Sequence, residues 1–261
     1  MFKRAAVLVV SCGAVLAGCG VDPQAENQEI VSNLIEAGFP AGDIQVIEEA
    51  VYVGRDAHVT LEASREMLQP GEGSAEQYRT TNLVSTSTVT KICVNPTSTF
   101  NSYSQFSQGL DLALQNYNAL GLCFTMARGP ATGCSAIINA QTTSGTGGSS
   151  GYPSGGKPYG TINIGTGVIN YGVDVIEHVI THELGHAFGL RHSDYYQQVI
   201  SCASGVNEGS AGVGAIHIPG TPTMASVNGS IMNACFTSGA TGEFTSSDIV
   251  ALRYLYGTCG T

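Results

Sequence analysis

The segment that most restricts the fold of this chain is THELGHAFGLRHSD, residues 181–194. It places three of the six histidines and one glutamate within eleven positions. His182 and His186 are four residues apart, so on a helix their side chains lie one turn apart on the same face. His192 would point away if the helix continued, so the chain has to turn back at Gly189, where glycine can adopt a left-handed conformation. The segment therefore predicts a helix that ends sharply and brings three imidazoles together.

Three neutral imidazoles are a typical ligand set for a catalytic zinc ion, which keeps a fourth position for water. Zinc lowers the pKa of that water and polarises a substrate carbonyl, and a neighbouring carboxylate can accept the proton. Glu183 is adjacent in sequence to a ligand without being one. We therefore expect one catalytic zinc ion held by His182, His186 and His192, with Glu183 as the general base in hydrolysis of peptide bonds.

Two other functions compete with peptide hydrolysis. One is a catalytically silent surface lipoprotein that binds zinc or peptides, but a site that has lost its activity is expected to lose its base first, and Glu183 is present. The other is a zinc ion that only stabilises the fold, but such sites usually close with a fourth protein ligand and often use cysteine. Peptide hydrolysis is therefore the preferred function.

Several polar residues near the motif are expected to have other roles. His178 continues the four-residue spacing but is expected to be a packed or solvated helix residue, and His58 and His217 are expected to be ordinary polar residues. Asp194 is expected to anchor the loop after His192, to hydrogen-bond a ligand ring, or to be a simple residue of the turn at the helix exit.

The N-terminus has the pattern of an export signal. Basic residues precede an apolar run over residues 5–18 that is too short to cross a bilayer as a helix. The run ends in LAGC, residues 16–19, which resembles the lipobox at which bacterial lipoprotein signals are cut. We therefore expect a signal peptide at residues 1–18 and a lipid anchor at Cys19; a plain secretory signal with a stray cysteine is the alternative. The protein would then be exported to the bacterial cell envelope, at the outer membrane or cell surface, or released outside the cell after processing.

Six further cysteines favour disulfides over reactive thiols, because their number is even and the chain is expected to be exported. Six cysteines can pair in many ways, and the sequence leaves the choice open. We expect Cys123 to pair with Cys134 across a short loop and Cys202 with Cys235. Cys93 and Cys259 would then connect the two ends of the domain.

Negative charge is concentrated in the first third of the chain. Residues 20–80 carry twelve acidic and three basic side chains, whereas residues 81–261 carry eight and five. This step predicts an acidic N-terminal module at residues 19–85 and a larger domain at residues 86–261. Because no basic patch is present, nucleic acid is not an expected partner. The expected partners are a peptide or protein substrate and, through the lipid anchor, the membrane.

Hydrophobic periodicity predicts helices and strands in both parts of the chain. The module is expected to have a helix around residues 30–35 followed by strands, as a small α/β unit. Strands of the larger domain are expected around residues 92–94, 122–126, 135–140 and 162–164, and helices over 106–120, 176–187 and 245–257. The segment 141–160 is rich in glycine and serine and predicts a mobile surface loop.

Pairs of residues at capping-box spacing predict where two of these helices begin. Asp174 and Glu177 precede the apolar run of the helix that carries the histidines. Thr245 and Asp248 have the same spacing before the last apolar run of the chain.

The pattern H-E-x-x-H-x-x-G-x-x-H resembles the signature of the metzincin metallopeptidases, in which a methionine turn follows. Met232 in SIMNA is the expected methionine, with Met224 as its rival, because SIM looks like the turn of astacins and the following helix is similar to the last helix of matrixins. With the lipobox and the acidic module, the nearest match is the bacterial dual-action HEIGH metallopeptidase family. The resemblance implies an α+β fold: a metzincin-like (zincin) catalytic domain with a twisted mixed sheet, an active-site helix and a Met-turn, preceded by a small α/β N-terminal module. Substrate is expected to lie extended along a sheet edge.

The resemblance also implies that the acidic module could be a pro-segment. Matrixin pro-segments block zinc with a cysteine, whereas residues 20–80 contain none. If the module inhibits, a carboxylate such as Asp43 or Asp56 has to occupy the metal. Proteolysis near residues 80–90 would then free the catalytic domain from its lipid. Structural metals like those of matrixins are not expected upstream of the active-site helix, because no Asp, Glu or His occurs between Asp111 and Asp174.

Overall fold

The computed structural model describes residues 23–68, 77–205, 207–208, 215–222 and 224–259. The predicted signal peptide and Cys19 lie outside these residues. Within them, no helix is both long enough and apolar enough to cross a membrane.

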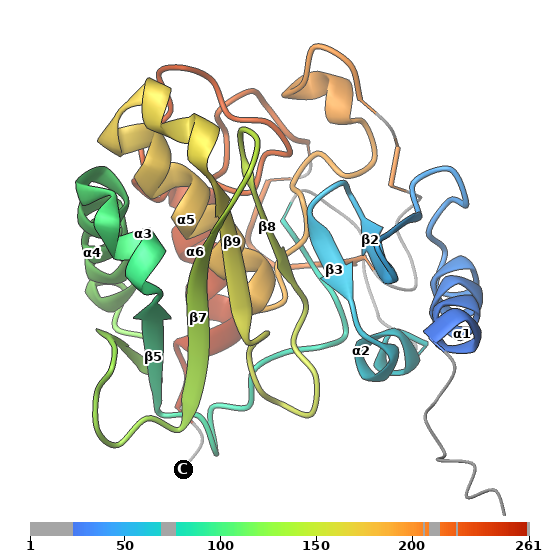
Figure 1. Cartoon of the computed structure of the whole chain (residues 1–261). Coiled ribbons are helices and arrows are strands. Elements are labelled where there is room, and N and C mark those ends of the chain that lie inside the picture. The colour runs from blue at the N-terminus through green and yellow to red at the C-terminus, as the bar shows by residue number, and fades with distance from the viewer. Residues whose placement is uncertain (1–22, 69–76, 206, 209–214, 223, 260–261) are drawn as a thin grey trace, which may run out of the picture.

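A twisted mixed sheet forms the centre of the larger part (Figure 1). β5 (Lys91–Pro96) runs parallel to β6 (Thr125–Arg128) and to β7 (Ala136–Thr143), and β7 runs parallel to β9 (Thr161–Gly165). β8 (Gly148–Gly151) is antiparallel to β9 and makes the sheet mixed. The α+β fold class with a twisted mixed sheet is therefore confirmed.

Helices cover this sheet and close one hydrophobic core. α4 (Ser104–Ala119) packs against α5 (Val173–Ala187), and α5 also contacts β8 and β9. The buried stripes of α4, α5 and α6 (Ser246–Tyr256) share a core with the apolar side chains of β5, β7 and β9. The remaining short elements of this part are β4 (Tyr78–Arg79), α3 (Ser98–Ser102), η1 (Thr166–Tyr171), η2 (Gln198–Ile200) and β10 (Ile216–His217).

The two predicted capping boxes have opposite outcomes. At α6 the side chain of Thr245 accepts from the backbone N–H of Asp248, and the Asp248 carboxylate accepts from the N–H of Thr245, as predicted. The prediction of a capping box at α5 is wrong, because this helix begins after Gly172 without a side-chain cap. The carboxylate of Glu177 instead accepts a hydrogen bond of 2.7 Å from Asn116 on α4, so a tertiary contact takes the place of the local one.

The glycine- and serine-rich segment 141–160 is not simply a loop. Its residues include the end of β7 and all of β8, which pairs with β9 on one side. Glycine and serine have low strand propensity, but backbone pairing on both edges of β8 outweighs that preference.

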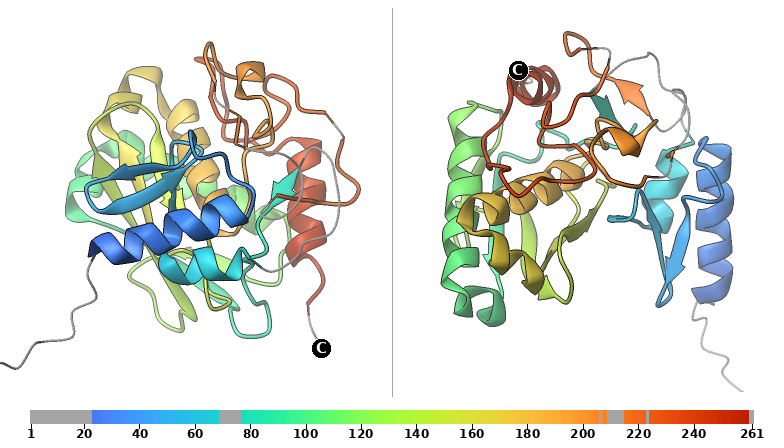
Figure 2. Two further views of the ribbon diagram at one scale, coloured as in Figure 1. Left: turned by 90° about the vertical axis from the view of Figure 1, so that its right-hand side faces the viewer. Right: turned by 90° about the horizontal axis from the view of Figure 1, so that it is seen from above.

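The N-terminal module, residues 23–68, has its own core. It comprises α1 (Pro23–Glu36), β1 (Gln45–Ile47), β2 (Ala50–Val53), β3 (Ala57–Val59) and α2 (Leu61–Glu66). The predicted helix and strands are present, and their buried side chains form a second cluster separate from the main core. β3 pairs in parallel with β8, so the module extends the sheet of the larger part to eight strands. In Figure 2, α1 lies on the outer side of the module, away from that sheet.

All six predicted disulfide cysteines are bonded, but two of the three expected pairs are wrong. Cys202 pairs with Cys235 as expected, whereas Cys93 pairs with Cys134 and Cys123 with Cys259. The parallel pairing of β5 with β7 brings Cys93 beside the residues that precede β7, and Cys123 hydrogen-bonds through its backbone to Tyr256 at the end of α6. The packing of strands and helices brings these cysteines together. Their separation along the chain does not reveal which of them pair.

Candidate metal centre

The end of α5 turns the chain back in the way that the motif predicts. Gly189 has a φ of +100°, and its N–H donates to the carbonyl of His186. The chain after it is held against residues 77–80, since Thr80 N–H donates to Gly189 (2.9 Å) and Arg191 N–H donates to Tyr78 (2.8 Å). This turn brings His192 back towards the face of α5 that carries the first two histidines.

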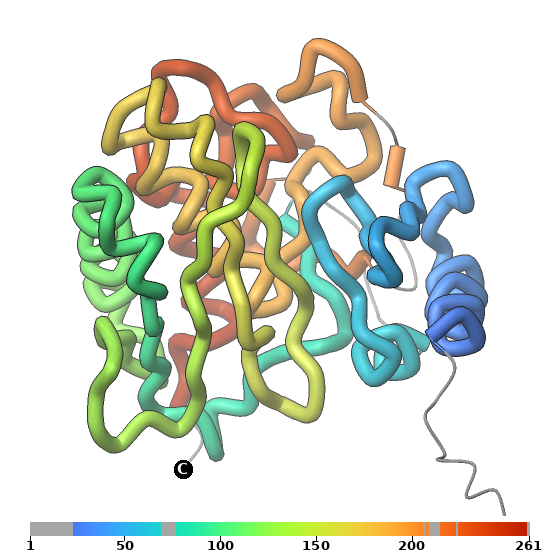
Figure 3. Tube along the Cα trace, in the orientation of Figure 1, coloured from blue at the N-terminus to red at the C-terminus, as the bar shows by residue number. Residues whose placement is uncertain are grey.

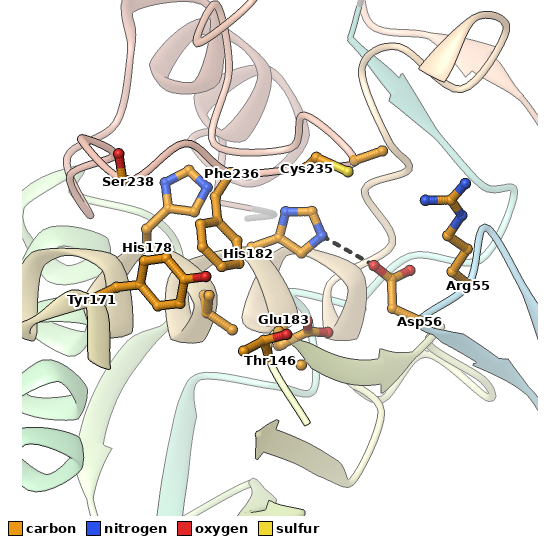
Figure 4. Close-up of a pocket in the computed structure, with 14 residues that line it drawn as sticks. Arg55, Asp56, Thr146, Tyr171, His178, His182, Glu183, Cys235, Phe236 and Ser238 are labelled. Atoms are coloured by element: carbon orange, nitrogen blue, oxygen red, sulfur yellow. Dashed lines mark ion pairs between the residues drawn. The ribbon is translucent and has the colours of Figure 1, made fainter. Parts of the chain in front are cut away.

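The structure brings His182, His186 and His192 together with Asp56, which comes from the N-terminal module. One ligand atom from each of these four residues lies within 4.8 Å of the others. The Nε2 atom of His192 is 3.2 Å from that of His186 and 3.2 Å from that of His182. Asp56 Oδ2 is 3.2 Å from His192 Nε2 and 3.7 Å from His182 Nε2, and Asp56 Oδ1 is 3.6 Å from His186 Nε2. Figure 4 shows the pair of Asp56 with His182.

The hydrogen bonds of the opposite ring nitrogens fix which atoms face the cluster. His182 Nδ1–H donates to the carbonyl of Ile231 (2.9 Å), and His186 Nδ1–H donates to that of Leu190 (2.7 Å). His192 Nδ1–H donates to Glu208 Oε1 at 2.7 Å. Because these oxygens only accept, each Nδ1 carries the proton and each neutral ring presents a lone pair at Nε2. Three lone pairs and a carboxylate that face one another repel unless a cation lies between them.

The donor set fits zinc. Zinc in proteins binds imidazole nitrogen at about 2.0–2.1 Å, which separates neighbouring ligand atoms of a tetrahedron by about 3.3–3.4 Å. The nitrogen separations of 3.2 Å match that value. Asp56 Oδ1 is buried and has no hydrogen-bond partner among the described residues, as a carboxylate aimed at a cation would be. Calcium and magnesium prefer oxygen ligands, so a site with three imidazole nitrogens does not suit them.

Burial and neighbouring charges shift the pKa values of the cluster in different directions. Burial lowers the pKa of His186 to about 3, which keeps its ring neutral. Burial lowers the pKa of His192, but the carboxylates of Asp56 and Glu208 on its two sides outweigh burial and raise it, so a proton on His192 Nε2 substitutes for a cation when none is bound. Burial alone would raise the pKa of Asp56, but a protonated His192 and its hydrogen bond hold it below its usual range. Glu183 lies beside the cluster and is buried, which raises its pKa well above the usual range, and the charge of Asp56 adds to this shift.

Glu208 is the functional residue that the sequence did not reveal. Its side chain is fully buried and accepts from His192 Nδ1, from Gln198 Nε2 and from Arg191 Nη2 (3.2 Å). It holds the third histidine in the tautomer and direction described above. A signal existed, because Glu208 is the only acidic residue between Asp194 and Glu243.

The other residues singled out in the sequence have structural contacts. Asp194 anchors the loop after His192, because it accepts from Ser201 and from the N–H of Ala234 (2.9 Å). His178 does not join the cluster: its Nδ1–H donates to Thr241, and burial lowers its pKa to about 4.

The two candidate methionines differ in burial. Met232 is fully buried and lies directly beneath α5, where a Cβ at Gly185 would collide with its sulfur. Ser193 N–H donates to the carbonyl of Met232 (2.8 Å), which joins this methionine to the residue after the third histidine. Met224 is 75% exposed, so it cannot pack beneath the cluster.

A cleft of about 450 Å³ opens beside the cluster. Its lining comes from five parts of the chain: the module, the segment before and within β8, the end of η1, the middle of α5, and the residues after Met232. In Figure 4, Glu183 lies at the floor of this cleft and Asp56 at one end of it, with His178, Tyr171 and Phe236 at the other.

The sequence profile of the dual-action HEIGH metallo-peptidases matches residues 51–256. The chain belongs to this family. It is therefore a metallopeptidase, and the resemblance seen in its sequence is confirmed. A dual-action HEIGH metallopeptidase has a metal at its centre, and the cluster described above is the place in this chain that fits one.

Comparisons with individual proteins add little to the family match. No curated protein matches the chain. Two solved structures of myroilysin are similar at 17% and 15% identity, with TM-scores of 0.40 and 0.39. Each similarity covers 65% of this chain, and they cover 93% and 83% of the two myroilysin chains.

Proposed function

We propose that this metallopeptidase is a zinc-dependent endopeptidase in which His182, His186 and His192 hold the metal. The observation that carries the proposal is the convergence of three Nε2 lone pairs, with that of His192 3.2 Å from each of the other two and each ring fixed by a hydrogen bond at Nδ1. Zinc, when bound there, supplies a Lewis acid that polarises a carbonyl and lowers the pKa of water. The protein supplies the rigid ligand set and the cleft in which a peptide can lie.

Glu183 is proposed as the general base. It lies on α5 next to a histidine of the cluster but is not a member of the cluster itself. Its carboxylate points into the cleft, and its Oε2 has no hydrogen-bond partner among the described residues, so this atom is free to take a proton. A carboxylate beside the reacting carbonyl can accept a proton from water and pass it to the leaving amine.

Met232 is proposed as the methionine of the Met-turn. Its burial and its contact with Gly185 support this role, since a flexible apolar side chain can fill the irregular space beneath the three ligands. The backbone of Ile231, next to it, accepts from His182, so the turn also orients one ligand.

We also propose that the protein is exported and anchored to the bacterial cell envelope through Cys19. The apolar run and LAGC at residues 16–19 support this proposal. Labelling with a fatty acid analogue is expected for the wild type and not for Cys19→Ser; equal labelling of both would contradict it.

A structural metal is the second candidate function, and Asp56 is the observation that favours it. Structural zinc sites close with four protein ligands, and Asp56 adds a fourth to the three histidines. Binding of zinc or peptide without cleavage would then be the activity of a silent surface lipoprotein. The cleft with Glu183 at its floor favours catalysis instead, because a purely structural site has no use for an unpaired carboxylate beside the metal.

The test is hydrolysis of casein and of a peptide library by the wild type and by Glu183→Gln, each with and without a zinc chelator. General acid–base catalysis contributes typically about 10²- to 10⁴-fold, so a loss of that size is expected for the variant at unchanged zinc content. Chelator-sensitive cleavage by Glu183→Gln at the wild-type rate would remove the assigned base.

A further inference from the structure

We propose that the N-terminal module inhibits the active site from within the same chain: Asp56 is a fourth ligand of the metal, and β3 covers the strand edge that a substrate needs. This inference rests on the proposed peptidase function and adds its regulation. Two separate contacts support it, one at the metal centre and one at the sheet edge.

The first contact is the carboxylate of Asp56 at the three histidines. Its two oxygens lie 3.2–3.7 Å from the three Nε2 atoms, while its side chain is only 16% exposed. A catalytic zinc site keeps its fourth position for water and substrate. Asp56 occupies the side of the histidines that faces the cleft, so a carbonyl could not reach the metal while the module stays in place.

The backbone of the β2–β3 hairpin is shaped to deliver this carboxylate. Val53 pairs with Ala57, so residues 54–56 form the turn. Within it, Gly54 and Arg55 both have positive φ values, +64° and +85°. Asp43 accepts from the N–H of Gly54 (3.1 Å), and the guanidinium of Arg55 donates to the carbonyl of Ser204 (3.1 Å). A left-handed conformation is costly for a residue with a side chain. These contacts hold the turn over the metal centre, and they place Asp56, rather than Asp43, at the histidines.

The second contact is the pairing of β3 with β8. Ala57 pairs with Ser150 and His58 with Gly151, and Ser150 N–H donates to the carbonyl of Asp56 (3.0 Å). Figure 3 shows this part of the trace running beside β8. Within the larger part β8 is one of the two edge strands, and its first residue, Gly148, lines the cleft together with Glu183. An extended peptide binds an enzyme by pairing with such an edge, and β3 already occupies it.

The contacts between the module and the larger part are mostly polar, which suits a part that can separate. The module buries its apolar side chains in its own cluster, to which the larger part adds only Tyr152 among the fully buried residues described. The bonds that cross between the two are polar, such as His58 with the hydroxyl of Tyr159 (2.6 Å) and Glu66 with the N–H of Gly155 (2.9 Å). Release of the module would therefore leave the main core intact and would remove only Tyr152 from the buried cluster of the module.

The experiment compares full-length wild type with Asp56→Asn, which keeps the shape of the side chain and removes its charge. Glu36→Gln is the matched control, because it removes the same charge from the exposed end of α1. Tyr159→Phe is a second variant, which loses only the hydrogen bond to His58. Each protein is loaded with Co²⁺ to record its visible absorption, and with Zn²⁺ to measure peptide hydrolysis.

Asp56→Asn is expected to change the Co²⁺ spectrum, because a ligand is altered, and to raise kcat/KM about tenfold or more. Tyr159→Phe is expected to leave the spectrum unchanged and to raise kcat/KM by about two- to tenfold, as the loss of one hydrogen bond allows. Glu36→Gln should match the wild type in both. The double variant Asp56→Asn/Glu183→Gln should keep the altered spectrum and lose the gain in hydrolysis.

Two other results would overturn the inhibition. If all single variants hydrolyse peptides at the wild-type rate and Asp56→Asn keeps the wild-type spectrum, the module does not inhibit, while the peptidase function stands. If no protein hydrolyses any peptide although each binds one zinc ion, the peptidase function fails, and the inhibition fails with it.

Discussion

Replacing Glu208 with glutamine is expected to weaken zinc binding about tenfold without unfolding the protein. Glu208 touches no metal itself; it accepts from His192 Nδ1 at 2.7 Å and is fully buried. Glutamine has nearly the same shape, and its oxygen can still accept from His192 Nδ1. Its NH2 group then faces Arg191 Nη2, so the substitution removes the negative charge and the bond from Arg191 but keeps the bond that orients His192.

The expected tenfold loss of zinc affinity follows from replacing a charged hydrogen-bond acceptor by a neutral one. A hydrogen bond to a charged group stabilises by roughly 1.5–3 kcal/mol and a neutral one by roughly 0.5–1.5 kcal/mol. The loss is therefore about 1.4 kcal/mol, which is a factor of about ten in a dissociation constant. Partners of metal-ligating histidines typically change metal affinity by about 10- to 100-fold, so the expected effect is at the lower end of that range.

The assay is competition for zinc between the full-length protein and a chromophoric chelator. Glu177→Gln is the matched control: Glu177 is also a buried glutamate, but it accepts its hydrogen bond from Asn116 rather than from a histidine. The control should bind zinc as the wild type does. Equal affinity of Glu208→Gln and wild type would refute the role of Glu208 in orienting His192, and equal weakening of both variants would show a general loss of stability instead.

Two further substitutions test the packing and the electrostatics around α5. Gly185→Ala is expected to lower the free energy of unfolding by about 1–3 kcal/mol, because the added Cβ meets the sulfur of Met232. This clash exceeds the roughly 0.5–1 kcal/mol that alanine gains in helix propensity. If urea denaturation shows equal or greater stability of the variant, Met232 moves aside. Burial, with the charge of Glu243, raises the pKa of Glu177 to about 7, so its contribution to stability is full below pH 4.5 and is lost as the pH rises through 7. Glu177→Gln should then match the wild type at pH 4 and melt at a higher temperature at pH 8, whereas parallel melting curves over this range would contradict the raised pKa.

The structure of the metal-binding segment could be predicted from interactions between residues that are close in sequence. The spacing of His182 and His186 depends only on the helical repeat, and the turn at Gly189 depends on what glycine alone can do without strain. The capping box at Thr245 and the apolar stripes of α4 and α5 are local in the same sense. These features could be predicted because each involves residues a few positions apart.

Features that depend on distant contacts could not be predicted in the same way. Glu208 meets His192 across a loop whose path has no periodic pattern, and β8 is a strand only because β9 and β3 pair with its two edges. The same reason explains the two wrong disulfides. The capping box at Asp174 failed for a related cause, since Asn116 offers Glu177 a partner from another helix.

The segment that follows the module limits where the chain could be cut without damage to the site. Gln77 donates to Asp248, which in turn accepts from the backbone of Ile231 beside Met232. Residues 78–80 hold the turn after α5 through Tyr78 and Thr80, and this turn delivers His192. A cut within residues 80–90 would separate these contacts from the chain of the larger part, so, if the module is removed, we expect the cut to lie before residue 77 rather than near residues 80–90. The module and the metal centre are thus joined by a segment that serves the centre itself, and only the residues before it are free to act as a removable inhibitor.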